Sequence, residues 1–383
     1  MNTQDAIKNA KTLVIKIGTA LIVDENGENT RQSWLDALAK DIAALQKQGK
    51  KVVIVSSGAV ALGRTSLGIA LDTPPQDIPL EKKQASSAIG QFHVFNGFHQ
   101  AFSQHDTPLA QVLLTMAETE NRRMYLNARA TLSELITAGV IPIINENDTI
   151  STGEIRFGDN DRLAARVAHM VEADAVVLLS TTDGLYTANP DKDSAAEHIP
   201  LIESISDEHC EMAGEAVPGM STGGMKSKVE AARAAMASGI HLIIANGQEN
   251  HCLKTVFEDK DTRTTLFFSK NSKKNAKKSW IGAHLNPKGS VVIDKGAFEA
   301  LKGGKSLLPV GVTDVEGIFE RGDVIEVFNE AGESVALGIT AYSSKDTKII
   351  MGQNKNHVHT LQGYAGREEL IHRNDLALKD GAA

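Results

Sequence analysis

The chain has 383 residues, of which 42% are hydrophobic, and its formal net charge at pH 7 is −8. A chain of this length can bury at least one large core and suggests two or three domains, which excludes a single small module. The acidic balance argues against a general nucleic-acid or membrane-surface binder, because such proteins need a clustered positive field to attract phosphates. Small-molecule chemistry in the cytoplasm fits better.

Targeting and cysteine signals are sparse. No apolar run of about eighteen residues occurs, and the first residues, MNTQDAIKNAK, lack the apolar stretch of a signal peptide. We therefore expect a cytoplasmic protein that does not bind membranes. Cys210 and Cys252 are too few and too far apart for a zinc knuckle or a disulfide framework, and the twelve histidines show no metal-ligand spacing. We expect both thiols to be reduced and structural, and no metal site built from side chains.

Short β-branched runs alternate with helical stretches over the first two-thirds of the chain. Helices are expected after the first strand, where Ser33 can cap a helix and Gly49 can end it, then from about 118 to 138, and from 226 to 238. Near-continuous apolar strands between helices indicate a mainly parallel sheet covered on both faces. The predicted strands are 12–17 (TLVIKI), 52–55 (VVIV), 140–144 (VIPII), 175–179 (AVVLL) and 240–245 (IHLIIA).

The composition changes near residue 270, where five lysines crowd a polar stretch that has nothing to bury. We predict one domain at 1–268, a linker at 269–278 and a second domain at 279–383. Beyond Trp280 turn residues become frequent, and short apolar runs occur at 291–293 and 324–328. The second domain is therefore expected to be compact and β-rich.

Two short motifs directly follow predicted strands. Lys16-Ile17-Gly18-Thr19 puts a positive charge at the carboxyl end of the first strand, where α/β folds bind ligands, and the glycine lets a phosphate approach the backbone. Ser56-Ser57-Gly58-Ala59 offers small side chains and backbone N–H groups that can face an anion. The alternatives are a surface lysine and an ordinary strand-to-helix turn. Neither a Walker A loop nor a G-x-G-x-x-G fingerprint follows a strand.

Two further motifs are rich in polar residues or glycine. Asn145-Glu146-Asn147-Asp148 follows the strand at 140–144, and Gly158-Asp159-Asn160-Asp161 follows about ten residues later. Amides and backbone donors suit a zwitterionic amino acid, whereas carboxylates suit its ammonium, a lysine or Mg²⁺. The alternative is a solvated loop or a helix N-cap by Asp159. The segment 222–228 (TGGMKSK) opens a helix beside a lysine, which predicts an anion site, with a glycine-rich hinge as the alternative.

Taken together and in this order, the motifs resemble the amino-acid kinase superfamily and, within it, the glutamate 5-kinase family. The resemblance implies a three-layer αβα sandwich with a mainly parallel central sheet and a C-terminal PUA-like domain. It also implies transfer of the γ-phosphoryl group of ATP, with Mg²⁺, to the side-chain carboxylate of L-glutamate, the first step of proline biosynthesis. It covers essentially the whole chain: VIKIGT, VSSGAVALG, LLTMAETENRRMYLNARATL, IPIINENDT, IRFGDNDRLAA, GLYTANP and TGGMKSK, then WIGAH, SLLPVGV and RGDVIEV in the PUA-like tail.

The same resemblance implies roles for individual residues. Lys16 and Lys228 contact the nucleotide phosphates and stabilise the transferring group, and we assign Asp159 and Asp161 to holding these lysines or ordering Mg²⁺ through water. The expected glutamate-binding residues are Ser57, Gly58, Ala59, Asn145, Asp148 and Asn160. The expected ATP-binding residues are Lys16, Gly18, Ser180, Thr181, Thr222, Gly223, Gly224, Met225, Lys226, Ser227 and Lys228. Two positions depart from the family pattern: Thr181 stands where aspartate is frequent, and Arg156 where lysine is common.

Partners are also implied by the resemblance. We expect feedback inhibition by proline, a homo-oligomer (dimer or tetramer), and transient contact with glutamate-5-semialdehyde dehydrogenase because acyl phosphates are labile. One alternative is another kinase of the superfamily, for acetylglutamate or aspartate, although such relatives as a rule lack a PUA-like tail. The other is an RNA-binding protein that acts through this tail. The lysine-rich linker supports it, and the acidic charge and the 4% aromatic content oppose it.

Overall fold

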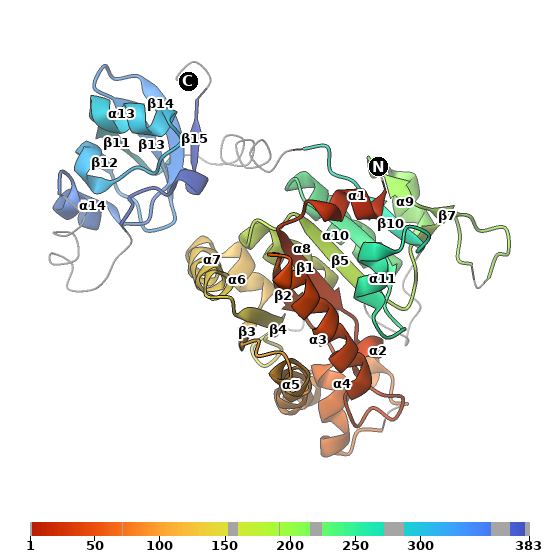
Figure 1. Ribbon diagram of the computed structural model, residues 1–383. Helices are drawn as coiled ribbons and strands as arrows, with labels where there is room; N and C mark the ends of the chain where they lie inside the picture. Colours follow the sequence, from red (N-terminus) through yellow and green to blue (C-terminus); the bar gives the residue numbers. More distant parts are fainter. Residues whose placement is uncertain are drawn as a thin grey trace. The chain divides into compact units, whose positions relative to one another are not determined.

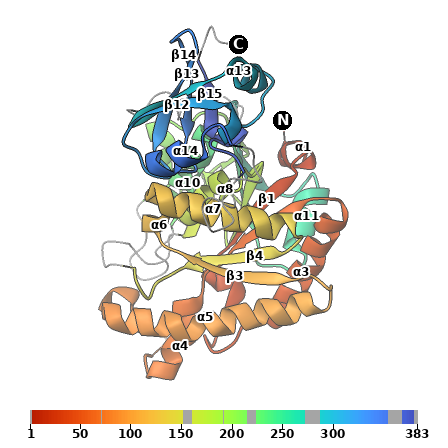
Figure 2. The same cartoon turned by 90° about the vertical axis from the view of Figure 1, so that its left-hand side faces the viewer.

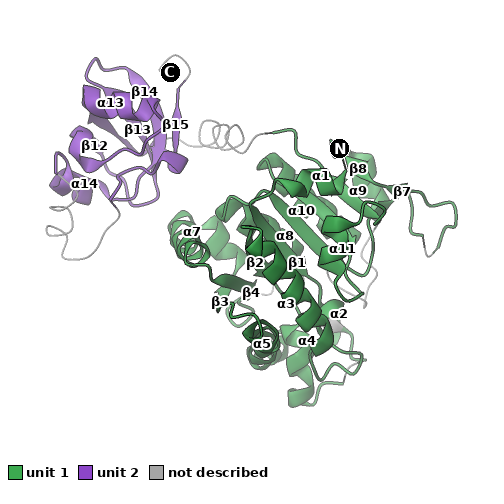
Figure 3. Cartoon of the chain, viewed as in Figure 1, with its two compact units in different colours: residues 1–273 green, residues 274–383 purple. Residues whose placement is uncertain are grey.

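The computed structural model describes residues 2–70, 72–151, 160–190, 192–214, 224–271, 287–353 and 368–379. The chain divides into two compact units, residues 1–273 and 274–383 (Figure 3). Each unit has its own sheet. Unit 1 has a hydrophobic core on each face of its sheet, and unit 2 has one core of its own. Among the residues described, no helix combines the length and the apolar character needed to cross a membrane.

Unit 1 is built on an eight-stranded sheet with the order β3-β4-β2-β1-β5-β9-β10-β8. Neighbouring strands are parallel except for β9 and β10, so the mainly parallel sheet expected from the sequence is confirmed. The strands are β1 (Thr12–Ile17), β2 (Lys51–Val55), β3 (Leu109–Leu114), β4 (Ile141–Glu146), β5 (Ala175–Ser180), β8 (Leu201–Ile202), β9 (His241–Asn246) and β10 (Thr264–Phe267). A separate two-stranded ribbon consists of β6 (Leu185–Tyr186) and β7 (His198–Ile199).

Helices cover both faces of this sheet (Figure 1, Figure 2). In β1, Leu13 and Ile15 belong to one core and Val14 to the other, which explains why the strand reads as a continuous apolar run. The first face carries α1 (Thr3–Lys8), α3 (Gln32–Lys47), α4 (Ala59–Arg64), α5 (Leu80–Ser103) and α11 (Cys252–Glu258). The second face carries α7 (Arg122–Thr137), α8 (Asn160–Met170) and α10 (Met225–Ala237). Shorter helices are α2 (Thr19–Ile22), α6 (Met116–Glu120) and α9 (Asp207–Met212), with 3₁₀ turns at Thr65–Leu67 and Pro75–Asp77.

Two helix boundaries differ from the sequence prediction. α3 begins before Ser33, because the carbonyl of Arg31 already accepts the N–H groups of Trp34 and Leu35; the predicted cap at Ser33 is therefore wrong. The predicted end at Gly49 is confirmed, since this residue follows α3 with a φ of 81°. The helix predicted from about 118 to 138 is two helices, α6 and α7. Asn121 separates them in an extended conformation and caps α7 through its side chain.

Unit 2 has a five-stranded sheet with the order β12-β11-β13-β14-β15, and the β-rich character expected of the tail is confirmed. Its core includes Phe319, Ile325 and Val327. The elements are β11 (Gly289–Ile293), α13 (Lys295–Lys302), β12 (Val312–Gly317), β13 (Val324–Asn329), β14 (Ser334–Ile339), α14 (Ser344–Ile350) and β15 (Leu376–Leu378), with 3₁₀ turns at Pro309–Gly311 and Arg373–Asp375. Most of the predicted linker lies outside the described residues. Its first residue, Ser269, packs in unit 1 and donates to the carbonyl of Met236.

Candidate active site

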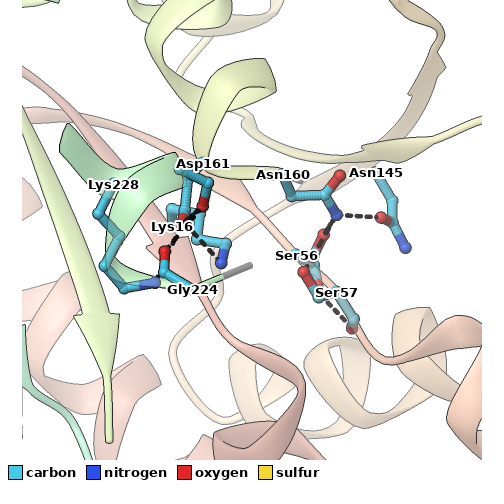
Figure 4. Close-up of polar contacts among 9 residues, drawn as sticks. Lys16, Ser56, Ser57, Asn145, Asn160, Asp161, Gly224 and Lys228 are labelled. Atoms are coloured by element: carbon cyan, nitrogen blue, oxygen red, sulfur yellow. Dashed lines mark hydrogen bonds and ion pairs between the residues drawn. The ribbon is translucent and has the colours of Figure 1, made fainter. Parts of the chain in front are cut away.

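The sequence motifs meet at the carboxyl edge of the unit 1 sheet. Because β4, β2, β1 and β5 are parallel neighbours, their carboxyl ends lie at the same edge, where α/β sheets bind ligands. Lys16 is the second-last residue of β1, Ser57 follows β2, and Asn145 is the second-last residue of β4. The first residues of α8 reach the same place and contact β1 and β4, and Lys228 in the first turn of α10 contacts Asp161 of α8 (Figure 4).

A fully buried carboxylate, Asp161, lies between two lysines (Figure 4). Lys16 Nζ is 2.7 Å from Asp161 Oδ1, and Lys228 Nζ is 2.9 Å from Asp161 Oδ2. The hydroxyl of Ser227 donates to the same Oδ2 at 3.0 Å. Burial by itself raises the pKa of Asp161, but the charges of the two lysines outweigh it and hold the pKa well below its usual range. The carboxylate therefore stays ionised at neutral pH.

This arrangement brings positive charge together in a place that is largely closed to water. The lysine side chains are only 7% and 6% exposed, and one carboxylate against two ammonium groups leaves an excess of one positive charge among the three. Lys16 comes from β1 and Lys228 from α10, so distant parts of the chain meet at Asp161 (Figure 4). Such a site is suited to bind phosphate and to stabilise charge on a transferring phosphoryl group.

A second cluster, made of neutral polar side chains, lies beside the lysines (Figure 4). Asn160 Nδ2 donates to the carbonyl of Ser56 at 2.6 Å, to Ser57 Oγ at 3.1 Å and to Asn145 Oδ1 at 2.9 Å. These bonds orient the amide, and its Oδ1 is buried without a hydrogen-bond partner among the described residues. Because an unsatisfied buried acceptor costs free energy, a ligand N–H at this position would be stabilising.

Helix α5 supports this cluster from the neighbouring layer. Gln91 Oε1 accepts from Asn145 Nδ2 at 3.2 Å, and Gln91 Nε2 donates to the carbonyl of Glu146 at 3.2 Å. One turn earlier, Ser87 Oγ donates to Asp148 Oδ2 at 2.5 Å. Burial raises the pKa of Asp148, and the hydrogen bond from Ser87 partly opposes this rise. Sequence reasoning missed Ser87 and Gln91, because contacts across more than fifty positions leave no local signal in the sequence.

The remaining residues predicted to bind glutamate, Gly58 and Ala59, directly follow Ser57 in the chain. Gly58 has a φ of 98°, in the left-handed region, where it precedes α4. Ala59 is buried and packs in the core of the first face, so its side chain is part of the core.

The residues predicted on the ATP side are spread along the same edge. Gly18 follows β1 and donates its N–H to the carbonyl of Leu179 at 3.3 Å. Ser180 ends β5, Thr181 is exposed after it, and Gly224 precedes α10. In the first turn of α10, Met225 packs partly against the second core and Lys226 is exposed. Of the predicted site residues, Asp159, Thr222 and Gly223 lie outside the described residues, as does Arg156.

The fold and the lysine-bearing edge of its sheet define a phosphate-binding enzyme of the amino acid kinase class. The model of the amino acid kinase family matches residues 11–246, which includes every described site residue, and the PUA domain model matches residues 289–361.

Curated relatives extend along almost the whole chain. A glutamate 5-kinase from Paramagnetospirillum magneticum is 47% identical over 370 residues, covering 97% of this chain and 98% of that protein. Glutamate 5-kinases from Brucella anthropi and Gluconobacter oxydans are each 46% identical to this chain. Each match covers 97% of this chain and 97% of the relative. The chain therefore belongs to the amino acid kinase family, as a member of its glutamate 5-kinase branch. The resemblance seen in the sequence motifs is confirmed.

Proposed function

We propose that the chain transfers the γ-phosphoryl group of ATP to the side-chain carboxylate of L-glutamate, giving L-glutamyl 5-phosphate for proline biosynthesis. Its curated relatives, named glutamate 5-kinase, match over nearly their full length. The observation that carries the proposal is the pairing of Lys16 and Lys228 on Asp161, directly beside the amide of Asn160. Asp161, which holds the two lysines, and Asn160, which offers an acceptor to the amino acid, are thus consecutive in the chain.

The nucleophile needs no general base. A glutamate side-chain carboxylate has a reference pKa of about 4.3 and is already ionised at neutral pH. The barrier is electrostatic, because an anion must approach a polyanion while charge collects on the equatorial oxygens of the transferring group. Lys16 and Lys228 supply positive charge at that point. Asp161 stays ionised and holds both ammonium groups close to each other. Without this carboxylate the two positive charges would repel each other.

The second cluster, together with the carboxylate of Asp148, suits the amino-acid end of the substrate. Asp148 Oδ1 accepts no hydrogen bond from the described residues, and Asn160 Oδ1 has no partner among them. We assign both oxygens to the α-ammonium group of glutamate, and the Ser57 hydroxyl and nearby backbone to its remaining polar atoms. Acetylglutamate has no ammonium group for the Asp148 carboxylate to accept, so Asp148 favours glutamate over that alternative.

We assign Mg²⁺ to the nucleotide rather than to a cage of side chains. No group of three His, Cys, Asp or Glu residues within the described ranges could hold a metal ion. Both oxygens of Asp161 face lysines, so this residue fits the role of holding them and does not fit direct metal ligation. In kinases Mg²⁺ usually keeps several waters and is bound by substrate phosphates together with one or two carboxylates, and not by a cage made of protein alone. Its charge would add to that of the two lysines.

Further partners follow from the same proposal. We propose that the enzyme is cytoplasmic, forms a homo-oligomer and passes its labile product to glutamate-5-semialdehyde dehydrogenase. Proline carries an ammonium and a carboxylate group like those of glutamate, so we propose that it competes for Asp148 and Asn160. Proline added to the kinase assay tests this, and an unchanged rate would reject it. For unit 2 we propose a role in tuning the kinase, and filter binding at physiological salt tests RNA as its alternative ligand.

An ADP-release assay with L-glutamate, N-acetylglutamate and L-aspartate tests the main proposal. We expect release with glutamate alone, and trapping with hydroxylamine should yield the glutamyl hydroxamate expected of an acyl phosphate. Preference for either other acceptor would assign the chain to another kinase of the family. ADP release without hydroxamate would contradict phosphorylation of a carboxylate.

A further inference from the structure

Helix α5 places a buried hydroxyl against the glutamate site. Ser87 is 1% exposed, and its Oγ donates to Asp148 Oδ2 at 2.5 Å across 61 positions of sequence. This is the one hydrogen bond that the described residues give to the Asp148 side chain. The bond therefore engages one carboxylate oxygen from the protein side and leaves Oδ1 to a ligand.

We propose that Ser87 is a positioning residue for the amino-acid substrate: it fixes the carboxylate of Asp148 so that Oδ1 accepts the α-ammonium of L-glutamate. The inference rests on the proposed function and deepens it. Ser87 acts through Asp148 and does not touch the reacting atoms.

The physical reason is that Asp148 lies in a turn after β4, whereas Ser87 lies inside a long helix, two turns from its start. A carboxylate in a turn can rotate about its side-chain torsions, and a hydrogen bond from a rigid element removes this freedom before the substrate arrives. α5 is rigid at this level because Gly90 packs directly on the backbone of α4: a Cβ at Gly90 would lie 1.8 Å from the carbonyl oxygen of Ala59.

The charge state of Asp148 also supports a role for Ser87 in substrate binding. An ammonium group needs an ionised carboxylate, and burial disfavours ionisation by raising the pKa of Asp148. The hydrogen bond from Ser87 lowers that pKa in part. One contact therefore supports both the orientation and the ionisation of the acceptor.

The experiment compares Ser87→Ala with Ser86→Ala in the full-length chain. Ser86 is a matched control, since its hydroxyl is equally buried on the same helix but donates to the carbonyl of Lys82. For Ser87→Ala we expect the KM for L-glutamate to rise about tenfold, as for the loss of one hydrogen bond to a charged group, with kcat and the KM for ATP nearly unchanged. Ser86→Ala should leave all three constants nearly unchanged, and Ser87→Thr, which keeps the hydroxyl, should recover part of the loss.

Glutarate separates positioning from a general packing defect. It has both carboxylates of glutamate and no ammonium group, so its inhibition constant should be the same in the wild type and in Ser87→Ala. In a double-mutant cycle, Ser87→Ala should add almost nothing to the effect of Asp148→Asn, because it acts through that residue. If Ser87→Ala does not fold, Ser87→Cys makes the same comparison with a side chain of similar size and a weaker donor.

The outcomes distinguish the two proposals. An unchanged KM for glutamate in Ser87→Ala, or an equal weakening of glutarate, would overturn the positioning role while wild-type activity left the proposed function intact. A wild type that releases no ADP with glutamate would overturn the proposed function itself.

Discussion

Gly18, directly after β1, has a backbone conformation open to any residue. Its φ is −74°, and a Cβ would meet only the carbonyl oxygen of Leu179, at an ordinary 3.7 Å. Gly58 differs, since its φ is 98° and a Cβ there would lie 3.1 Å from Val23. The fold thus requires glycine at 58 and not at 18, which points to a ligand as the reason for the glycine at 18.

We therefore expect Gly18→Ala to keep or slightly raise the stability, by about 0.5 kcal/mol, because alanine restricts the unfolded chain. The KM for ATP should rise, since the added methyl group would take up the space that we propose for a phosphate. Gly58→Ala should instead lower the melting temperature. Calorimetry and ATP kinetics on both variants check this, and an unaltered KM for ATP in Gly18→Ala would remove Gly18 from the nucleotide site.

Lys228 is expected to act in the transition state more than in substrate binding. Charge builds up on the transferring group as it leaves ATP, so Lys228→Ala should lower kcat by about 100-fold or more and change the KM for glutamate far less. Lys254→Ala, which removes an exposed lysine on α11, is the control. Steady-state kinetics of both variants measure kcat and the KM for glutamate. An unchanged kcat in Lys228→Ala would exclude Lys228 from the mechanism.

The ionised carboxylate of Asp148 should lower the free energy of unfolding at neutral pH, although it serves substrate binding. Because burial raises its pKa in the folded state, the fold holds the proton more tightly than the unfolded chain does. Its contribution to stability is therefore most favourable at low pH, and it declines as the pH rises from the ordinary value of 3.8 through the raised folded-state pKa. Asp148→Asn cannot ionise, so it should unfold at higher urea than the wild type at pH 7 and lose this advantage near pH 3.

The urea midpoints at these two pH values measure the effect, and the KM for glutamate should rise in the same variant. A variant no more stable than the wild type at neutral pH would show that the charge of Asp148 is well compensated in the folded protein.

The elements show which parts of the site the sequence could reveal. β1, β2, β4 and β5 were predicted because both faces of each strand are buried, which yields apolar runs, and the residues at their carboxyl ends share one edge by topology. α5 was not predicted. Its buried positions recur at helical intervals, but several are polar or glycine, so no apolar stripe marks the helix: Ser86, Ser87, Gly90, Gln91, Val94, Gly97 and Phe98. Two of the polar members, Ser87 and Gln91, contact residues more than fifty positions away, which no local pattern encodes.

The contact between α4 and α5 should be intolerant of a single methyl group. A Cβ at Gly90 would lie 1.8 Å from the carbonyl oxygen of Ala59, and backbone cannot move aside as a side chain can. We expect Gly90→Ala to destabilise the fold by about 1–3 kcal/mol and to raise the KM for glutamate, because α5 would shift with Ser87 and Gln91. Gly97→Ala is the control, since its Cβ would meet side-chain atoms of Thr30 and Leu35 at 2.9 Å or more. Equal effects of the two variants on that KM would contradict a special role for Gly90.

The candidate active site lies within one unit. All the described site residues and both cores that flank the large sheet lie within residues 1–273, whereas unit 2 has a separate core of its own. Each unit therefore has what an independently folding domain needs. A chain ended after Lys273 should fold and keep glutamate-dependent ADP release, and calorimetry of the full chain should show two transitions, one of them at the melting temperature of the shortened chain. A shortened chain that folds but is inactive would show that unit 2 takes part in catalysis. The regulatory role proposed for unit 2 would then be wrong.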